Sequence, residues 1–380
     1  MEELRGGSAW LVGGAVRDLL LGQEVLDYDL AVQGDGFELG RRVARRLRAA
    51  FVPLDETRGM SRVVHKPVQI DFASLTGDSI EADLSHRDLT INAMAMEVGG
   101  QGRLIDPTGG QEDLRTGWVR VPAAEVLDDD PLRILRVFRF AGKYRYRIQE
   151  ETLWAAASRG ALLRAVSPER VRVELFKILG CDPAVPLLSE MAAIGVLGIV
   201  LEPFGGLAVD GLERAWRLEG RAFSPGLRSW LVENQGEERT RRSLLKLLAL
   251  SAQPHGQGAS ALRLSAREVR SVERLAHVGP LSTDDWESWF PLFEACQNDS
   301  PGAALLAGFD DPCVEDLFAR WQAWMAAGKS PLLKGQDIMA LTGLKPGPAV
   351  GQLTMLLRRE HAAGRVTSPE AAADFLKRQL

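Results

Sequence analysis

The sequence has few of the features that mark secreted, zinc-binding or membrane-embedded proteins. It contains only three cysteines, Cys181, Cys296 and Cys313, an odd number without zinc-site spacing, which argues against a disulfide framework. No stretch approaches the roughly 18 apolar residues that a membrane-spanning helix needs. The start, Met-Glu-Glu, is followed by no apolar signal-peptide core. We therefore expect a cytoplasmic protein that does not enter a membrane, and no pattern points to an obligate protein partner.

A run near the N-terminus has the features of a phosphate-binding turn. Residues 10–12 read as a short buried strand that ends at Gly13 and Gly14. Because glycine lacks a Cβ atom, backbone N–H groups there can approach phosphate oxygens, and the following helix directs its positive end at them. Arg17 lies on the first turns of that helix, within reach of a triphosphate.

Two aspartates close the same run. Asp27 and Asp29 are two residues apart on a segment that reads as extended, so both side chains point to one face. Paired carboxylates suit hard divalent cations such as Mg²⁺. An Asp-x-Asp pair alone is usually two solvated loop residues, but after a glycine turn it predicts a site for phosphate and metal.

The apolar pattern divides the chain into a mixed first part and a helical remainder, and 380 residues suffice for two to four domains. Strand-like and helix-like runs alternate up to about residue 120, and helical spacing begins near Pro131. Ser167-Pro168 predicts a helix start, and glycine, proline and serine predict connectors at 203–211 and 251–260. The early strands are predicted at Trp10–Val12, Tyr28–Val32, Phe51–Pro53, Val63–His65 and Val68–Phe72, with helices at 15–21 and 36–49.

Positive charge is concentrated locally, although the net charge of the chain is −5. The segment from Arg133 to Lys177 contains eleven Lys and Arg residues but only four Asp and Glu residues. Basic runs are more often solvated helix faces than binding sites, but one beside a nucleotide site favours a phosphate backbone as partner. Two smaller runs consist of Arg41, Arg42, Arg45, Arg46 and Arg48, and of Arg239, Arg241, Arg242 and Lys246.

The run from Asp83 to Asn92 partly matches the catalytic loop of protein kinases. Three residues separate Asp88 from Asn92, whereas the kinase pattern has four. No glycine-rich loop with a downstream strand lysine precedes it, and Asp71-Phe-Ala stands before it instead of a metal-binding Asp-Phe-Gly after it. These differences exclude a protein kinase.

A further motif, Asp129-Asp130-Pro-Leu-Arg133, offers groups that can read a base. Asp130 and Arg133 are three residues apart at a predicted helix start, so they share a face and provide an acceptor beside a planar fork of donors. That pair complements cytosine or adenine, whose amino groups donate, and rejects uracil and guanine, which place a carbonyl there. The plain alternative is a carboxylate at a helix N-terminus with a salt bridge to Arg133.

With Asp106-Pro-Thr-Gly-Gly-Gln-Glu-Asp113 and the run from Glu169 to Leu175, these motifs resemble the class II tRNA nucleotidyltransferases. These enzymes build the 3′ CCA end of tRNA and share their head domain with bacterial poly(A) polymerases. The resemblance is specific over roughly the first 180 residues. It implies an α+β fold: a DNA-polymerase-beta-like head (1–120) and helical neck (121–185, base-reading), body (186–275) and tail (276–380, tRNA-binding) domains.

The resemblance also implies roles for individual residues. Asp27 and Asp29 would hold two Mg²⁺ ions, which activate the tRNA 3′-OH and stabilise displacement of pyrophosphate. Asp130 and Arg133 would read the base of CTP, with ATP as a further possible substrate. The remaining nucleotide-binding residues would be Gly13, Gly14 and Arg17 at the triphosphate, Arg87, Asp88 and Asn92 at the ribose, and Arg136.

This chain departs from the family pattern in three places. Position 86 is His where the family usually has Arg, and position 129 is Asp where Glu is usual. Only residues 74–80 separate Ala73 from Glu81, where CCA-adding and A-adding relatives carry a longer flexible loop with an Arg near its start. The short loop predicts an enzyme that adds two cytidines and stops. The alternatives are a full CCA-adding enzyme, a poly(A) polymerase and a catalytically silent tRNA-binding protein.

Overall fold

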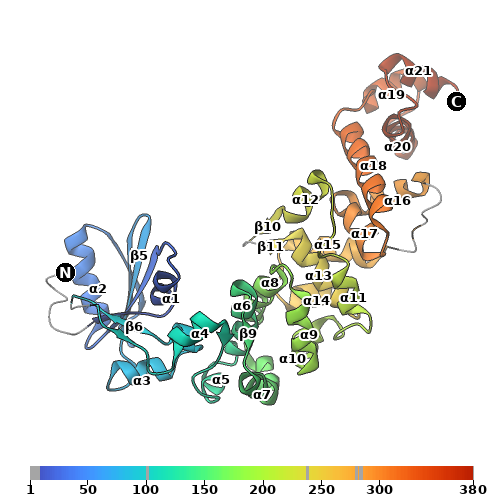
Figure 1. The fold of residues 1–380 in the computed structure, drawn as a ribbon. Coiled ribbons are helices and arrows are strands. Elements are labelled where there is room, and N and C mark those ends of the chain that lie inside the picture. The colour runs from blue at the N-terminus through green and yellow to red at the C-terminus, as the bar shows by residue number, and fades with distance from the viewer. Residues whose placement is uncertain (1–8, 100–101, 237–238, 279–280, 282–285, 380) are drawn as a thin grey trace. The chain divides into compact units, whose positions relative to one another are not determined.

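The structure, a computed structural model, describes residues 9–99, 102–236, 239–278, 281 and 286–379. The chain folds as two units, Met1–Val200 and Leu201–Leu380 (Figure 1). A mixed sheet followed by helical regions confirms the predicted α+β class. The finer division into head, neck, body and tail stays a prediction. No helix in the described ranges is long and apolar enough to cross a membrane.

The first unit begins with a seven-stranded sheet in the order β3-β4-β5-β2-β1-β6-β7. Its central strands β2 and β5 run parallel, and the other neighbouring pairs are antiparallel. The parallel pair brings two segments far apart in sequence into register at the middle of the sheet. The strands are β1 (Ala9–Val12), β2 (Asp27–Val32), β3 (Ala50–Asp55), β4 (Met60–His65), β5 (Val68–Ser74), β6 (Ala95–Glu97) and β7 (Leu104–Ile105).

The two faces of this sheet are covered differently. On one face the helix α2 (Gly36–Leu47) packs so closely that a Cβ atom on Gly40 would lie 2.2 Å from the Ser61 hydroxyl. On the other face Ala31 belongs to an apolar cluster with Leu84 of α3 (Ile80–Ser85). Because side chains alternate along a strand, Asp27 and Asp29 share the Ala31 face, away from α2.

Local sequence signals predicted most of these early elements. The five predicted strands correspond to β1–β5, and the predicted helices correspond to α1 (Gly14–Leu20) and α2. The second helix ends two residues earlier than expected, because Arg48 adopts a left-handed conformation with φ 51°. The short strands β6 and β7 were not predicted, since two to three residues give no periodicity to detect.

The rest of the first unit is mostly helical. Ser167 precedes a helix as predicted, but its side chain makes no capping hydrogen bond. The strands β8 (Trp118–Val119) and β9 (Arg147–Ile148) pair in parallel. The helices are α4 (Gly110–Thr116), α5 (Val126–Asp129), α6 (Arg133–Tyr144), α7 (Glu150–Arg159), α8 (Pro168–Leu179), α9 (Val185–Ala193) and α10 (Val196–Val200), with 3-10 helices η2 (Thr90–Asn92) and η3 (Gly160–Ala165).

The second unit is helical apart from the ribbon of β10 (Asn234–Gly236) and β11 (Arg239–Thr240). Near its end, residues 343–347 connect the helices α19 (Gly335–Thr342) and α20 (Pro348–Ala362). The other elements are α11 (Gly211–Trp216), α12 (Pro225–Val232), α13 (Arg241–Leu250), α14 (Gly256–Ala261), α15 (Ala266–Ala276), α16 (Trp289–Cys296), α17 (Ser300–Leu306), α18 (Asp311–Lys329) and α21 (Pro369–Lys377), with 3-10 helices η4 (Glu202–Phe204), η5 (Trp286–Ser288) and η6 (Gln297–Asp299).

The predicted connector at 251–260 is partly wrong, because α14 begins within it. The imidazole of His255 accepts a hydrogen bond from the Gly258 amide at 2.9 Å and so caps the helix. A Cβ atom on Gly258 would lie 2.4 Å from the Pro203 carbonyl oxygen, so glycine is needed for close packing here. The glycines that suggested a loop therefore serve helix packing.

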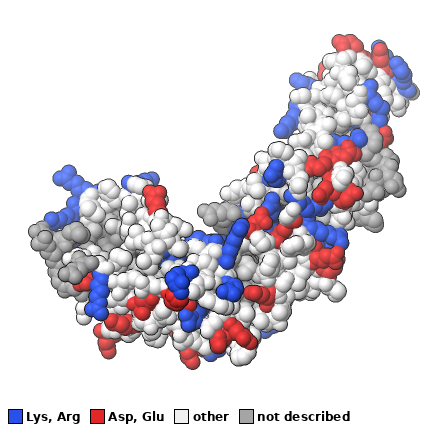
Figure 2. Space-filling model, viewed as in Figure 1, with Lys and Arg blue, Asp and Glu red and all other residues white. Residues whose placement is uncertain are grey.

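The basic runs of the sequence differ in their surroundings. The run on α2 is exposed, as expected of a solvated helix face. The run from Arg239 to Lys246 is different, since Arg239, Arg241 and Lys246 are buried. The expectation of a solvated face was wrong there. On the visible face of the second unit, Figure 2 shows basic and acidic side chains interspersed.

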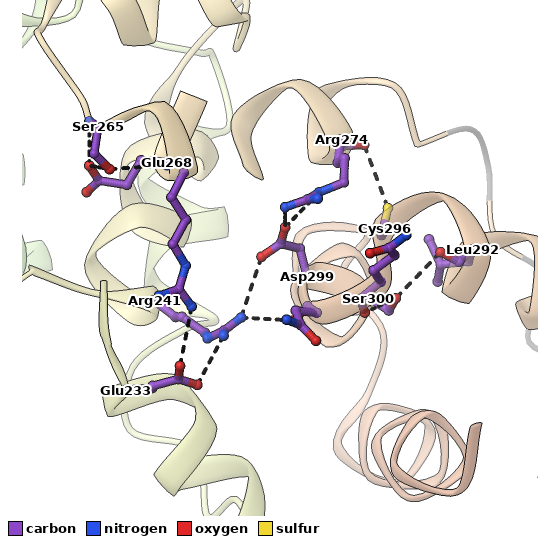
Figure 3. A network of polar contacts seen from close by, with 12 residues as sticks. Glu233, Arg241, Ser265, Glu268, Arg274, Leu292, Cys296, Asp299 and Ser300 are labelled. Carbon is purple, nitrogen blue, oxygen red and sulfur yellow. Dashed lines mark hydrogen bonds and ion pairs between the residues drawn. The ribbon is translucent and has the colours of Figure 1, made fainter. Parts of the chain in front are cut away.

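Buried cations in the second unit are neutralised by carboxylates from other elements. Arg241 donates to Glu233 at 3.0 Å and lies 3.5 Å from Asp299, which also accepts from Arg274 (Figure 3). Lys246 and Glu219 form another pair, at 2.5 Å, with side chains 1% and 2% exposed. Burying such charges is costly, so each pair constrains how the helices that carry it can pack.

Replacing Glu219 by Ala should strongly destabilise the second unit, by about 3–5 kcal/mol, because the Lys246 ammonium would lose its buried carboxylate. Chemical denaturation followed by tryptophan fluorescence measures the change. Glu213→Ala is the matched control, since Glu213 pairs with Arg217 at the surface and such pairs contribute little. Equal, small effects of both substitutions would contradict the structural role of the buried pair.

Candidate active site

A cavity of about 710 Å³ in the first unit collects the residues that the sequence singled out. It is lined by Gly13, which follows β1, by Asp29 of β2, and by residues of α1, α3, η2, α5, α6 and α8. Asp27 is not among its lining residues. The other predicted residues all line it: Gly13, Gly14, Arg17, Asp29, Arg87, Asp88, Asn92, Asp130, Arg133 and Arg136.

Asp27 and Asp29 begin strand β2, where extended backbone places both carboxylates on one face. The Asp27 carboxylate accepts a hydrogen bond from the side-chain amide of Gln69 at 3.1 Å. Asp29 is in register with Asp71 of the parallel strand β5. Asp71 is held in turn by Arg62, whose guanidinium donates to both of its oxygens at 2.7 and 2.8 Å.

The electrostatics around Asp29 fit a cation. Burial raises the pKa of Asp29, and the nearby Asp71 and Asp27 carboxylates raise it further, while Arg87 opposes them. A bound cation would offset the burial and the neighbouring negative charges that disfavour the ionised form of Asp29, and carboxylate oxygens are ligands that suit Mg²⁺. Within the described ranges no group of three or more His, Cys, Asp or Glu side chains that could hold a metal ion is gathered. The assignment of Asp27 and Asp29 as metal ligands stays a prediction.

Gly13 stands directly beside this pair. It adopts φ +69°, and a Cβ atom there would lie 3.0 Å from the Arg87 guanidinium and 3.7 Å from the Asp29 carboxylate. Its amide donates to the Met94 carbonyl at 3.3 Å. The sequence predicted that this amide would face phosphate, but it is used within the fold. What Gly13 offers the cavity is the space left by its missing side chain.

Arg17 does not extend freely toward a triphosphate, as the sequence had suggested. Its side chain is nearly buried, and its guanidinium donates to Asp18 at 2.8 Å and to the Asn92 carboxamide oxygen. The guanidinium also lies 5.2 Å from the centre of the Phe140 ring. The local pattern placed Arg17 on the correct turn, but only its contact with Asp18 is local, and those with Asn92 and Phe140 come from residues distant in sequence.

Asp88 is a buried residue that lines the same cavity. Burial opposes its ionisation, but Arg136 and hydrogen bonds from Asn92 and the Leu89 amide outweigh that effect and lower its pKa. Arg136 donates to Asp88 at 2.7 Å, and Asn92 donates to it at 3.0 Å. Arg87, next in sequence, is held by Asp83 through two hydrogen bonds of 2.9 and 3.1 Å.

The predicted pairing of Asp130 with Arg133 along one helix face is wrong. Asp130 is extended, with φ −144°, and caps α5, while Arg133 begins α6. The Asp130 carboxylate instead accepts from Arg170 of α8 at 2.7 Å. Arg133 donates through Nη1 to the carbonyls of His86 and Val126, at 2.9 and 3.0 Å. Both side chains still line the cavity.

The two departures from the family pattern face each other. His86 Nδ1 lies 3.8 Å from an oxygen of Asp129, and both residues line the cavity. The shorter Asp129 therefore has a contact with His86, and Arg133 is oriented by backbone carbonyls.

The connection between β5 and α3 is only five residues long, 75–79. Its backbone is tied to the head, because the Leu75 amide donates to Val32 and the Thr76 amide donates to the Asp83 carboxylate. The Ser79 hydroxyl then caps α3. The segment has no length to reach beyond this edge of the cavity.

Three site residues were missed as such from the sequence. Arg170 holds Asp130, Asp83 holds Arg87, and Asp71 acts on Asp29. Asp83 had a signal, because it is four residues before Arg87 on a helix. Arg170 belongs to the family run from Glu169 to Leu175, but nothing local indicated its contact with Asp130, 40 positions away, or that of Asp71 with Asp29, 42 positions away.

Comparison with known proteins agrees with this geometry. A family model described as the poly A polymerase head domain matches residues 9–79 and 58–120. A second, described as the probable RNA and SrmB-binding site of polymerase A, matches residues 145–204. The first covers the sheet and the cavity residues Asp29 and Asp88.

Relatives match over nearly the whole chain. A CC-adding tRNA nucleotidyltransferase of Geobacter sulfurreducens is 36% identical over 99% of this chain and 93% of its own length. An A-adding tRNA nucleotidyltransferase of Deinococcus radiodurans is 31% identical over 97% of this chain and 95% of its own. The fold is that of a Thermotoga maritima CCA-adding enzyme complexed with tRNA, with TM-score 0.78, 24% identity and coverage of 98% and 91%.

Gly13→Ala should weaken nucleoside triphosphate binding by tenfold or more, on the scale of about 1.4 kcal/mol per tenfold, because the new methyl group would displace Arg87. Isothermal titration with CTP and Mg²⁺ measures the change. Gly22→Ala is the matched control, because Gly22 has φ +66° and nothing within 4 Å. Both variants carry the conformational penalty of a positive φ, about 1–2 kcal/mol. Equal loss of binding in both would mean that strain, and not space in the cavity, explains the effect.

Proposed function

The chain belongs to the tRNA nucleotidyltransferases, and from that membership we propose that it adds two cytidines to the 3′ end of tRNA from CTP and releases pyrophosphate. The same membership makes tRNA and nucleoside triphosphates its substrates, and the cytoplasm is where it would meet them. Which nucleotides are added is the part that needs an argument from this chain's own residues.

The observation that carries CC addition is the five-residue connection between β5 and α3. A pocket that accepts C and then A must change, because cytosine and adenine differ in size and in where their acceptor nitrogen lies. Mobile loops commonly complete such changes. Here the connection is short and hydrogen-bonded to Val32 and Asp83, so it cannot act as a lever on α6.

The base-reading residues are also held from several sides. Arg133 is fixed through Nη1 by two carbonyls, and can still donate to a base through Nε and Nη2. Asp130 is fixed by Arg170, and a carboxylate can accept the amino group of cytosine through its remaining lone pairs. Supports from α3, α5 and α8 favour one arrangement of donors and acceptors. A pocket with one arrangement selects one base, because an unpaired buried group is costly.

The other residues supply positioning and charge. Asp27 and Asp29 would hold Mg²⁺, which supplies activation of the attacking 3′ hydroxyl and stabilises charge on the α-phosphate when bound. Gly13 leaves room for the triphosphate beside Asp29, and Arg87 lies at the same edge with its charge compensated by Asp83. Asp88 and Asn92 offer an acceptor and an amide to the ribose. The helices of the tail, 276–380, would bind the remainder of the tRNA.

Asp27→Ala or Asp29→Ala should reduce CMP transfer to tRNA by more than tenfold while the fold and tRNA binding persist, since each removes a metal ligand that contributes several kcal/mol to the transition state, at about 1.4 kcal/mol per tenfold. Transfer is measured with radiolabelled CTP, and folding by thermal melting. Asp78→Ala, at an exposed position that does not line the cavity, is the matched control. A variant that keeps more than about a tenth of the wild-type rate would refute the metal assignment.

Given CTP, ATP and Mg²⁺ together, the protein should convert a tRNA without its 3′ end into tRNA-CC and go no further. A preformed tRNA-CC with ATP should remain unextended. Products are sized at single-nucleotide resolution, and a full CCA-adding enzyme run in parallel shows that the ATP and tRNA are usable. Efficient formation of tRNA-CCA would replace the proposal with the full CCA activity, and addition of A alone to tRNA-CC would favour the activity of the A-adding relative.

A further inference from the structure

Arg17 has a place in the site that its predicted role does not explain. It lines the cavity, yet its donors are used within the protein. Nε and Nη2 meet Asp18, each at 2.8 Å, and Nη1 meets the Asn92 carboxamide oxygen. Its side chain is only 5% exposed. A buried guanidinium with these partners orients its neighbours more readily than it extends to a substrate.

One stripe of α6 meets this arrangement. Arg136, Phe140 and Tyr144 are spaced four residues apart, so they lie on the same face of the helix. The Arg17 guanidinium lies 5.2 Å from the Phe140 ring centre and 5.3 Å from that of Tyr144. The Tyr144 hydroxyl donates to Asp18 at 3.2 Å. Burial raises the pKa of Tyr144 to about 12, so the hydroxyl remains a donor at neutral pH.

Two residues of this stripe, Tyr144 and Arg136, are the two ends of a continuous path of polar contacts. From Tyr144 the path runs through Asp18 and Arg17 of α1 to Asn92 of η2. From Asn92 it continues to Asp88, at 3.0 Å, and returns to α6 at Arg136, at 2.7 Å. The path therefore connects α6, the helix that starts at Arg133, with Asp88 and Asn92.

This path allows only one orientation of the Asn92 amide. Arginine only donates and an ionised aspartate only accepts, so the amide oxygen must face Arg17 and the amide nitrogen must face Asp88. A rotated amide would direct its N–H groups at the guanidinium and its oxygen at the carboxylate. Asn92 is 5% exposed and Asp88 is 7% exposed, so little water is present to compensate for misplaced groups.

We propose that Phe140 and Tyr144 are positioning residues for sugar recognition, because they hold Arg17 and thereby fix Asn92 and Asp88 against the ribose of the incoming nucleotide. Discrimination between CTP and 2′-deoxy-CTP then depends on residues of α6 that act through Arg17, namely Phe140, which also lines the cavity, and Tyr144, which does not. The inference rests on the proposed function in one respect, namely that Asp88 and Asn92 meet the ribose of CTP.

The test compares CTP with dCTP in Tyr144→Phe and Phe140→Leu variants. Steady-state kinetics on a tRNA without its 3′ end give kcat and KM for each nucleotide, and isothermal titration gives their Kd without transfer. In both variants the preference for CTP over dCTP should shrink by roughly tenfold, the size expected when the ribose 2′ hydroxyl loses a hydrogen bond to a charged group such as Asp88. The change should appear mainly as a higher KM and Kd for CTP, while dCTP is nearly unaffected.

Two substitutions on the same segment serve as matched controls. Tyr146→Phe removes a similar hydroxyl, which donates to the Leu114 carbonyl at 3.0 Å. Phe138→Leu removes similar aromatic packing from α6, and Phe138 is buried but does not line the cavity. Both should retain the wild-type preference for CTP, even where thermal melting shows lower stability.

An unchanged CTP-to-dCTP ratio in Tyr144→Phe and Phe140→Leu, with both nucleotides weakened in parallel, would overturn the proposal and leave a structural role only. Asp18→Asn alters the same path at α1, and its CTP-to-dCTP ratio tests the proposal if an α6 variant does not fold. Absence of CMP transfer by the wild-type protein would refute the proposed function, but the two Kd values would still decide the positioning role.

Discussion

The ion pair between the buried Asp88 and the partly exposed Arg136 joins the segment that follows α3 to α6. Asp88 follows α3 in the head, and Arg136 lies one turn into α6, the helix that Arg133 begins. Removing Arg136 would leave the buried Asp88 carboxylate without its cation, whereas Arg136 without Asp88 would remain partly solvated, because its side chain is 33% exposed. The pair therefore holds the residues proposed for sugar and base recognition in one spatial relation.

Other contacts repeat that constraint at both ends of the pair. Arg133 reaches back to the His86 carbonyl of the head, and Tyr144 reaches Asp18 at the other end of α6. The connection 75–79 is bound to the head. A pocket that is fixed at so many points has little freedom to reshape itself between nucleotides. This is the physical basis for proposing a single base specificity in a family whose relatives include both CC-adding and A-adding enzymes.

Sequence patterns predicted the features that depend on neighbouring residues. The strand, glycine turn and helix around Gly13, and the paired carboxylates of β2, follow from local spacing and are present. The contacts of Arg17 with Asn92, of Asp130 with Arg170 and of Lys246 with Glu219 were not predictable, because these partners are distant in sequence. The Asp130 carboxylate accepts a hydrogen bond from Arg170, 40 positions away, although Arg133 is only three positions away. Such choices depend on helix packing, for which one sequence contains no direct signal.

The central claim is that the pocket keeps one base preference whatever tRNA end it holds. Equilibrium binding of CTP and ATP tests this most directly, measured with the protein alone and with the protein bound to tRNA ending in CC. A terminal 3′-deoxycytidine prevents transfer during the measurement. The account predicts that CTP binds more tightly in both states, with little change in the ratio of the two Kd values. A reversal in favour of ATP on the CC-ended tRNA would contradict it.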